Sequence, residues 1–338
     1  MRVGLWLPTF APDMVAAADT KVVELARLAE RCGLDGLWVI DHMLPTTGEV
    51  HSGSWYDPIV SLAAAAAVTE RLELGTASLV AGPRHPVALA KQVASLAALA
   101  GPRVTIGVSS GWAPEEYECF GYRLAERGER TDEVAAVLRR LLETAPVDSP
   151  GPRYPFENVR LVPRPQWRIP VLIGGGSRAP ESGSAADRAY LATPVLERIK
   201  RFDGWLAPCA GDEAMTFADL ALVNEAVGNR EFRRVHVQWT HVVDTDDTDR
   251  ALAEQIPAFG RVMGDRSVEN LRASYLTGSL ADITERVARI AAAGFDDIII
   301  GPVESTAAQV ELISELASAV DGTIRVPAGI SGEQGPYR

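Results

Sequence analysis

Apolar residues recur in one order along this chain: a stretch with helical spacing, then a glycine, then a short continuous apolar run. Residues 22–32 show this spacing, Gly33 follows them, and 36–40 has the pattern of a fully buried strand. The same order returns near the other end of the chain, where Gly294 precedes the apolar run 297–300. Glycine tolerates the positive φ at which many helices end. The pattern therefore predicts repeated units of helix, tight turn and strand.

These units predict an α/β fold, because short helix-to-strand turns between apolar strands are typical of a parallel sheet with helical crossovers. Eight units favour a closed (β/α)8 TIM barrel over an open, doubly wound sheet. The eight strand candidates are residues 3–7, 36–40, 72–78, 103–108, 170–173, 203–206, 235–242 and 297–300.

The Pro-rich stretch 146–170 is the best candidate for a linker between two domains. It contains aromatic residues such as Tyr154 and Trp167, so we interpret it as a packed connection inside one barrel. We predict a single domain over residues 1–325 and a tail over 326–338. Loops longer than usual are often lids in barrels, and the expected loop insertions lie at about 145–169, 177–200 and 243–280.

The segment 243–280 is expected to hold one amphipathic helix. It opens with an Asp-rich run, 244–249. Acidic residues stabilise the first turn of a helix through the helix dipole, so we interpret this run as a helix start rather than as a metal site.

Composition narrows the possible partners. The 338 residues include 45 acidic and 33 basic ones, which gives a net charge of −12, and no block of Lys or Arg is present. This balance argues against nucleic-acid binding. Three scattered cysteines, Cys32, Cys119 and Cys209, match neither a disulfide framework nor zinc-ligand spacing. No stretch has the length of a membrane span or a signal peptide. We expect a cytoplasmic protein with a small-molecule substrate, no membrane partner and no bound metal.

Polar residues follow several predicted strands, at the end of a TIM barrel where active sites lie. Asp41 and His42 directly follow the second strand. His42 is a candidate general base or hydrogen-bond donor to a cofactor ring, although a histidine satisfied within the barrel rim fits the pattern equally well. His241, in the seventh strand, has the same two interpretations. We place His241, Phe10 after the first strand and Trp112 after the fourth in a candidate substrate pocket.

Residues 174–178 (GGGSR) follow the buried strand 170–173. Consecutive glycines allow backbone N–H groups to approach an anion, while Ser177 and Arg178 add a hydroxyl and a charge. This loop predicts a phosphate site built from Gly174, Gly175, Gly176, Ser177 and Arg178, although a flexible turn would have a similar composition. The dinucleotide fingerprint GxGxxG is absent from this loop.

At these residues the chain resembles the luciferase-like family of flavin-dependent monooxygenases and deazaflavin-dependent oxidoreductases. The specific stretch runs from Gly107 through Trp112 to Glu133, and shorter pieces at 37–45, 57–58, 69–76, 86–92, 169–176 and 203–205 support it in order. Over residues 1–210, the order and spacing of these pieces make the resemblance to the family specific. Beyond residue 210, the chain matches the family only in pattern.

The resemblance implies a (β/α)8 barrel with a flavin-type ring in its mouth, near His42, Thr76, Ala77 and Ser78. It places the cofactor phosphate at the glycine loop, with Ser109 and Ser110 nearby. It also implies a cis peptide bond near Ala77–Ser78 and a homodimer. Two positions depart from named subgroups: luciferases have a phosphate-binding Arg where this chain has Ser110, and some deazaflavin dehydrogenases have a catalytic acid where it has Trp112.

Two redox functions and one non-catalytic function follow from these residues. The first is a monooxygenase that uses O2 and reduced FMN from a separate reductase, with His42 and Asp41 as catalytic residues. The second is hydride transfer from reduced coenzyme F420, supplied by its own reductase. The third is a degenerate barrel that binds a ligand or a partner subunit.

Overall fold

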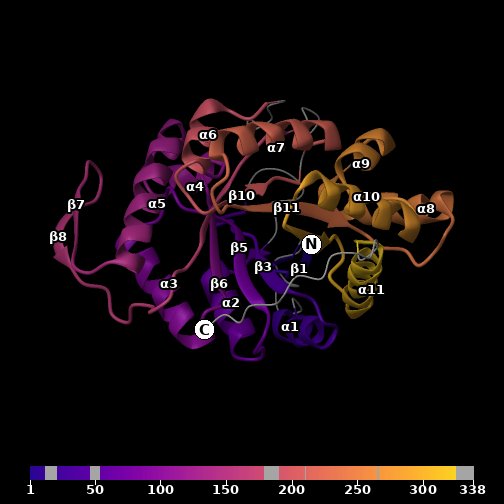
Figure 1. Cartoon of the computed structure of the whole chain (residues 1–338), viewed down its shortest axis with the longest axis horizontal. Helices are drawn as coiled ribbons and strands as arrows, with labels where there is room; N and C mark the ends of the chain where they lie inside the picture. Colours follow the sequence, from indigo (N-terminus) through magenta and orange to yellow (C-terminus); the bar gives the residue numbers. More distant parts are fainter. Residues whose placement is uncertain (12–20, 46–53, 179–189, 210, 265, 325–338) are drawn as a thin grey trace.

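The computed structural model describes residues 1–11, 21–45, 54–178, 190–209, 211–264 and 266–324. Within them, eight parallel strands close into a barrel, in the spatial order β1-β12-β11-β10-β9-β6-β5-β3 (Figure 1). Each strand overlaps one of the eight predicted from the apolar runs, so the predicted TIM barrel is confirmed. The strands are β1 (Arg2–Trp6), β3 (Gly36–Val39), β5 (Glu73–Val80), β6 (Val104–Ser109), β9 (Val171–Gly174), β10 (Gly204–Ala207), β11 (Arg233–Thr240) and β12 (Asp297–Pro302).

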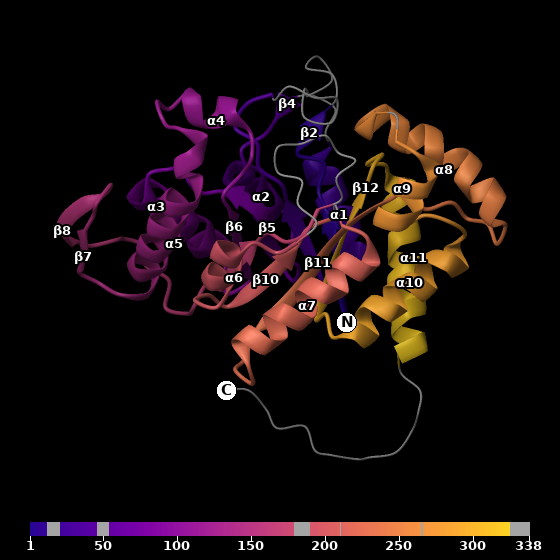
Figure 2. The ribbon, with the colours of Figure 1, turned by 90° about the horizontal axis from the view of Figure 1, so that it is seen from above.

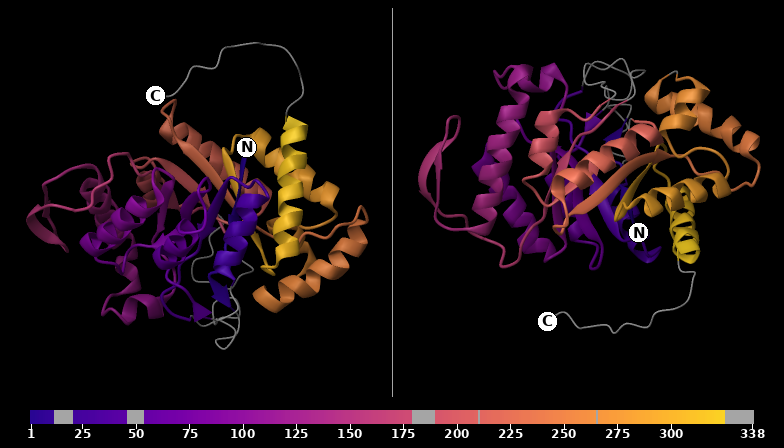
Figure 3. Two further views of the ribbon diagram at one scale, coloured as in Figure 1. Left: turned by 90° about the horizontal axis from the view of Figure 1, so that it is seen from below. Right: turned by 45° about the horizontal axis from the view of Figure 1, so that its top comes forward.

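Helices surround this barrel, and the last one closes the ring against the first (Figure 3, left). The helices are α1 (Val22–Arg31), α2 (Pro58–Ala66), α3 (Pro86–Ala100), α4 (Pro114–Glu118), the 3-10 turn η3 (Leu124–Glu126), α5 (Arg127–Glu143), α6 (Thr193–Ile199), α7 (Glu213–Val227), α8 (Thr248–Met263), α9 (Val268–Ser274), α10 (Leu280–Ala293) and α11 (Ala307–Ile324). Gly33 and Gly294, which the sequence pattern placed after helices, have φ values of 81° and 108°. None of the helices in the described residues is long and apolar enough to cross a membrane.

Trp38 fills the barrel interior because glycines on adjacent strands leave room for its ring. A Cβ on Gly75 would lie 2.2 Å from Trp38 Cε3, and one on Gly4 would lie 2.6 Å from Trp38 Nε1. Trp38 is 2% exposed. Its burial shows how a large side chain and the small residues around it together fill the barrel core.

The N-terminal end of the barrel carries an ion cluster around Arg233. Its guanidinium donates hydrogen bonds to Glu73 on β5 and Asp297 on β12, at 2.6 to 2.8 Å. Burial alone would lower the pKa of Arg233, but the hydrogen bonds to Asp297 and Glu73 outweigh it and raise that pKa above its ordinary value. The cluster ties three strands together at the end opposite the candidate site.

Two additions to the barrel lie on opposite sides of it (Figure 2). The predicted packed connection contains an antiparallel hairpin, β7 (Val147–Pro150) and β8 (Pro155–Val159), which projects beyond α5.

On the other side of the barrel, the expectation of one helix between residues 243 and 280 is wrong, since α8 and α9 both lie there. Gly264, at φ 69°, ends α8, and Ser267 caps α9. The Asp-rich run does begin a helix: the Asp247 side chain accepts hydrogen bonds from the first turn of α8.

Candidate functional site

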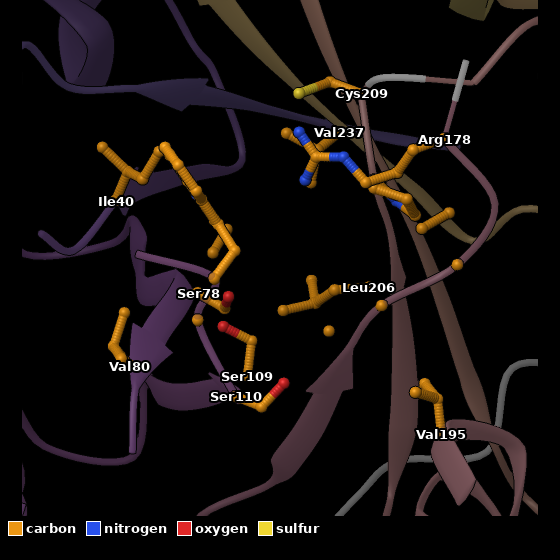
Figure 4. A pocket seen from close by; sticks show the side chains of 18 of the residues that line it. Ile40, Ser78, Val80, Ser109, Ser110, Arg178, Val195, Leu206, Cys209 and Val237 are labelled. Carbon is orange, nitrogen blue, oxygen red and sulfur yellow. The ribbon is translucent and has the colours of Figure 1, made fainter. Parts of the chain in front are cut away.

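A cavity lies at the carboxyl ends of the strands. Residues of β1, β5, β6, β9, β10 and β11, together with the loop after β3 and other loops at this end, line it (Figure 4). Most of the predicted site residues meet there, although they come from distant parts of the chain. The predicted residues that line the cavity are Asp41, His42, Ala77, Ser78, Ser109, Ser110, Trp112, Gly174, Gly175, Gly176 and Arg178.

Thr76 and Ser177, both predicted to bind the cofactor, are not among the lining residues. The Thr76 hydroxyl donates to the Gly107 carbonyl at 2.7 Å and accepts from the Gly107 N–H at 3.0 Å, so it joins β5 to β6. The Ser177 hydroxyl and N–H both donate to the Asp219 carboxylate on α7, at 2.8 and 2.6 Å. Both hydroxyl groups therefore serve the barrel wall and the glycine loop instead of facing the cavity.

His241, predicted in the substrate pocket, also lies away from the lining. It faces Glu304 across 3.7 Å, and burial lowers its pKa below the ordinary value. Phe10 belongs to the short strand β2 (Phe10–Ala11), which pairs with β4 (Ser54–Trp55), but its side chain lies outside the described part of the structure. Of the three residues predicted for the substrate pocket, Trp112 is the one that the structure places in the cavity wall.

The cis peptide bond implied by the resemblance is present between Ala77 and Ser78. At this point the register between β5 and β6 shifts, between Thr76 and Leu79. A Cβ on Gly174 would lie 3.1 Å from the Ser78 hydroxyl oxygen. The glycine at the end of β9 therefore allows the backbone to pass close to Ser78 on the cavity floor.

His42 is held from behind by a carboxylate that the sequence reasoning did not single out. Its Nδ1 lies 3.1 Å from Glu116 Oε1, and the Met43 N–H donates to the same oxygen at 2.6 Å. The His42 ring packs against Trp55 and, edge to face, against Trp112, with ring centroids 4.6 and 5.9 Å apart. Glu116 lies within the motif 107–133, but only the fold brings α4 beside a residue 74 positions away.

Asp41 lines the cavity next to His42, but its carboxylate is paired. Arg84 donates to both of its oxygens, at 3.0 and 2.9 Å, and the Val80 N–H donates at 2.9 Å. Burial raises the pKa of Asp41, and the Arg84 guanidinium opposes that rise. These contacts connect the end of β3 to the loop after β5.

Ser109 and Ser110 end β6 and carry their hydroxyl groups toward the cavity (Figure 4). Tyr117 donates a hydrogen bond to the Ser110 carbonyl at 2.6 Å. Burial raises the pKa of Tyr117 well above its ordinary value, so its hydroxyl stays a donor. A Cβ on Gly82 would lie 2.2 Å from the Tyr117 hydroxyl oxygen, so a glycine there makes room for this contact.

The glycine loop is partly engaged by its own neighbours. The Gly175 N–H donates to the Leu206 carbonyl at 3.3 Å, and the Trp205 indole donates to the Gly175 carbonyl at 2.6 Å. These bonds give the loop a defined shape. Arg178 extends its guanidinium into the cavity, facing the side that carries Ser78 and Ser109 (Figure 4). A second cation that no sequence pattern indicated, Arg127, at the start of α5, also lines the cavity.

This set of groups fits a flavin-type cofactor with a phosphate. Two guanidinium groups and two serine hydroxyls are donors suited to a phosphate, and glycines leave space for close backbone approach. Apolar side chains also line the cavity, among them Ile40, Val80, Leu206 and Val237. An apolar wall with a few polar groups is typical of a site for a planar cofactor.

The family model described as luciferase-like monooxygenase matches residues 1–220 of the 338-residue chain. The chain belongs to this family. Its members are oxidoreductases, and both F420-dependent and FMN-binding proteins occur among the chain's relatives and structural neighbours.

Several curated relatives match part of the chain. An uncharacterized protein of Mycobacterium tuberculosis is 31% identical over 201 residues, which cover 55% of this chain and 65% of the relative. The F420-dependent glucose-6-phosphate dehydrogenase of Amycolatopsis mediterranei is 33% identical over 172 residues, 49% of this chain and 51% of that protein. The 4-hydroxyprotoasukamycin monooxygenase of Streptomyces nodosus subsp. asukaensis is 30% identical over 177 residues, 51% and 46% respectively. The chain thus spans less than two thirds of the length of these relatives.

Solved structures match over nearly the whole chain. The monooxygenase RslO1 from Streptomyces bottropensis has a TM-score of 0.77 at 21% identity and covers 96% of this chain and 100% of that one. The oxygenating constituent of 3,6-diketocamphane monooxygenase from Pseudomonas putida, solved with FMN, has a TM-score of 0.71 at 17% identity and covers 94% and 98%. These likenesses agree with the barrel fold.

Proposed function

We propose that this chain is a monooxygenase that binds reduced FMN in the mouth of the barrel and uses O2 to oxygenate a small organic molecule. The observation that carries the proposal is the cavity itself, which brings His42, Ser109, Ser110, Arg127 and Arg178 together with apolar side chains. Reduced FMN would supply the electrons for O2 chemistry. Apolar walls favour such chemistry, because they exclude water from a reactive site.

In this proposal each group of the chain has a distinct task. Arg127, Arg178 and the serine hydroxyls bind the phosphate through charge-assisted hydrogen bonds, and the glycines let it approach the backbone. His42 faces the reacting end of the cavity and accepts or donates a proton there. Trp112 packs on the His42 ring and helps to exclude water. Asp41 holds Arg84 and the strand end in place.

Hydride transfer from coenzyme F420 is the second candidate function. It is supported by the 33% identity to the F420-dependent dehydrogenase and by the position of His42, which could protonate an acceptor. Trp112 favours the monooxygenase, because it replaces the acid that some deazaflavin dehydrogenases carry there. Asp41, which also faces the cavity, is paired with Arg84 and is a poor proton donor.

The proposed partners follow from the same function. A separate reductase would supply reduced FMN or F420 in the cytoplasm. We also propose a homodimer, which the resemblance to the luciferase-like family implies. Light scattering of the purified chain tests this directly, and a monomer at micromolar concentration would contradict it.

Anaerobic titration of the apo protein tests the choice of cofactor. Oxidised FMN, reduced FMN and F420 are added separately, and binding is followed by absorbance and by quenching of tryptophan fluorescence. We expect reduced FMN to bind most tightly. Preferential binding of F420 would replace the proposal by the hydride-transfer function. Binding of none of the three would leave the degenerate, ligand-binding or partner-subunit function.

A further inference from the structure

A buried carboxylate stands directly behind the histidine of the cavity. Glu116 is fully buried, at 0% exposed, and is not among the lining residues, whereas His42 is 6% exposed and lines the cavity. The two meet through Glu116 Oε1 and His42 Nδ1, at 3.1 Å. Nδ1 is turned toward Glu116, so the other ring nitrogen, Nε2, is the one that does not meet this carboxylate.

The chemistry of this contact determines where the imidazole proton lies. An ionised carboxylate can only accept hydrogen bonds, so the Nδ1 that it faces must carry the proton. Glu116 Oε1 also accepts the Met43 N–H at 2.6 Å, and that second donor keeps the oxygen pointing at the end of β3. We propose that Glu116 is a positioning residue that holds neutral His42 in its Nδ1–H tautomer, so that Nε2 meets the cavity as a proton acceptor.

Two hydrogen-bonding groups at the end of β3 hold the Glu116 carboxylate in place. Its second oxygen, Oε2, is buried and has no hydrogen-bond partner among the described residues, so His42 and Met43 are the groups that hold this carboxylate. The neighbouring carboxylate, that of Asp41, is paired with Arg84. Among the described residues, the titratable and charged groups that face the pair from the ends of β3 and β5 and from α4 are Asp41, Arg84, Tyr117 and Cys119.

Helix α4 also makes a hydrogen bond to the loop after β6. Tyr117, the next residue, donates to the Ser110 carbonyl at 2.6 Å. Consecutive residues of one short helix thus hold the loop after β3 and the loop after β6. The catalytic consequence rests on the proposed function, in which the Nδ1–H tautomer leaves Nε2 of His42 as the base. A carboxylate orients the catalytic imidazole of hydrolases in the same way.

The tautomer is measured on the full-length apo protein with 15N-labelled histidine, using long-range 1H–15N correlation spectra above pH 8. His42→Asn assigns the His42 signals among the five histidines. We expect wild-type His42 to show a protonated Nδ1 and an unprotonated Nε2. In Glu116→Ala, the ring is expected to shift to the Nε2–H form that free histidine prefers. Glu116→Gln keeps an acceptor oxygen oriented by the Met43 N–H, so it is expected to preserve the Nδ1–H tautomer.

Glu118→Gln is the matched control, since Glu118 lies on the exposed side of the same helix and should leave the His42 spectrum unchanged. An Nε2–H tautomer in the wild type would overturn the proposal, as would an unchanged tautomer in Glu116→Ala. If Glu116→Ala does not fold, the wild-type spectrum alone decides, because an Nε2–H tautomer there overturns the proposal.

A second readout connects the tautomer to turnover. Once a substrate is in hand, Glu116→Ala is expected to lower kcat/KM by roughly 10–100-fold, with Glu116→Gln closer to wild type, as for other residues that orient a functional imidazole. Failure to bind FMN or F420 would end the proposed function but would leave the tautomer result standing. A wrong tautomer with normal cofactor binding would end the present proposal alone.

Discussion

Asp41→Asn separates a positioning role for Asp41 from a catalytic one. The substitution keeps the size of the side chain and an oxygen for the Val80 N–H, and it removes the charge that pairs with Arg84. Asp41 is 3% exposed and the Arg84 side chain 12%, so the pair is largely shielded from water. The substitution therefore leaves a guanidinium with one weaker partner, Asp57, at 3.3 Å.

Removing one partner of a buried ion pair costs about 3–5 kcal/mol, because the remaining charge is left uncompensated. Asp57 and the retained hydrogen bond to Val80 place Asp41→Asn at the lower end, about 3 kcal/mol. For a domain of this size, that loss lowers Tm by roughly 4 °C. Urea unfolding at pH 7, followed by circular dichroism, measures the loss as a lower midpoint at an unchanged slope.

A double-mutant cycle sharpens the test. Arg84→Met alone should also destabilise, since it leaves the Asp41 carboxylate buried without its cation. The variant with both substitutions should lose less than the sum of the two single losses, because it has no uncompensated charge. Glu197→Gln, in an exposed i,i+3 pair with Lys200, is the matched control and should leave stability unchanged within error. Wild-type stability in Asp41→Asn with impaired cofactor binding would refute the reasoning and make Asp41 part of the site chemistry.

Three further predictions concern other parts of the molecule. Burial lowers the pKa of His236 to about 3, below its unfolded value of about 6.5, so the protein should lose stability as pH drops from 6.5 toward 3. His236→Gln should flatten that loss in acid-unfolding curves, and an unchanged curve would contradict this. Gly107→Ala should destabilise the protein by about 3 kcal/mol, because its Cβ would lie 2.3 Å from the Thr76 carbonyl oxygen, whereas Gly260→Ala, in open space within α8, should stabilise it by about 0.5–1 kcal/mol. Thermal-unfolding shifts of the same sign for both variants would count against the packing argument. Arg178→Met should weaken binding of phosphate-bearing FMN about 10–100-fold but leave riboflavin binding unchanged, by fluorescence titration; equal loss for both ligands would remove Arg178 from the phosphate site.

The sequence predicted the barrel because its signal is local and repeated. Apolar runs, helical spacing and terminating glycines such as Gly33 and Gly294 are properties of short segments, and eight of them in series leave few topologies. The same logic predicted that residues after each strand would share one cavity. His42, Ser109, Ser110 and Arg178 do so, because parallel strands place their carboxyl ends on the same side of the barrel.

Sequence reasoning failed where the face of a side chain or a distant partner decided its role. Thr76 was grouped with Ala77 and Ser78, but its hydroxyl turns to β6, since successive side chains on a strand alternate in direction. Ser177 was assigned to a phosphate and instead meets Asp219, 42 positions away. His241 stands outside the cavity wall for a similar reason, facing Glu304.

By itself, then, the sequence determined the order of helices and strands, the barrel they close into and the edge of the barrel where polar groups gather. Only the tertiary structure decided which of those groups face the cavity and which hold others in place: the pairing of Asp41 with Arg84 and of His42 with Glu116 joins residues 43 and 74 positions apart. Periodicity is written into neighbouring residues, whereas a hydrogen bond between distant residues exists only once the packed barrel has brought their side chains within about 3 Å.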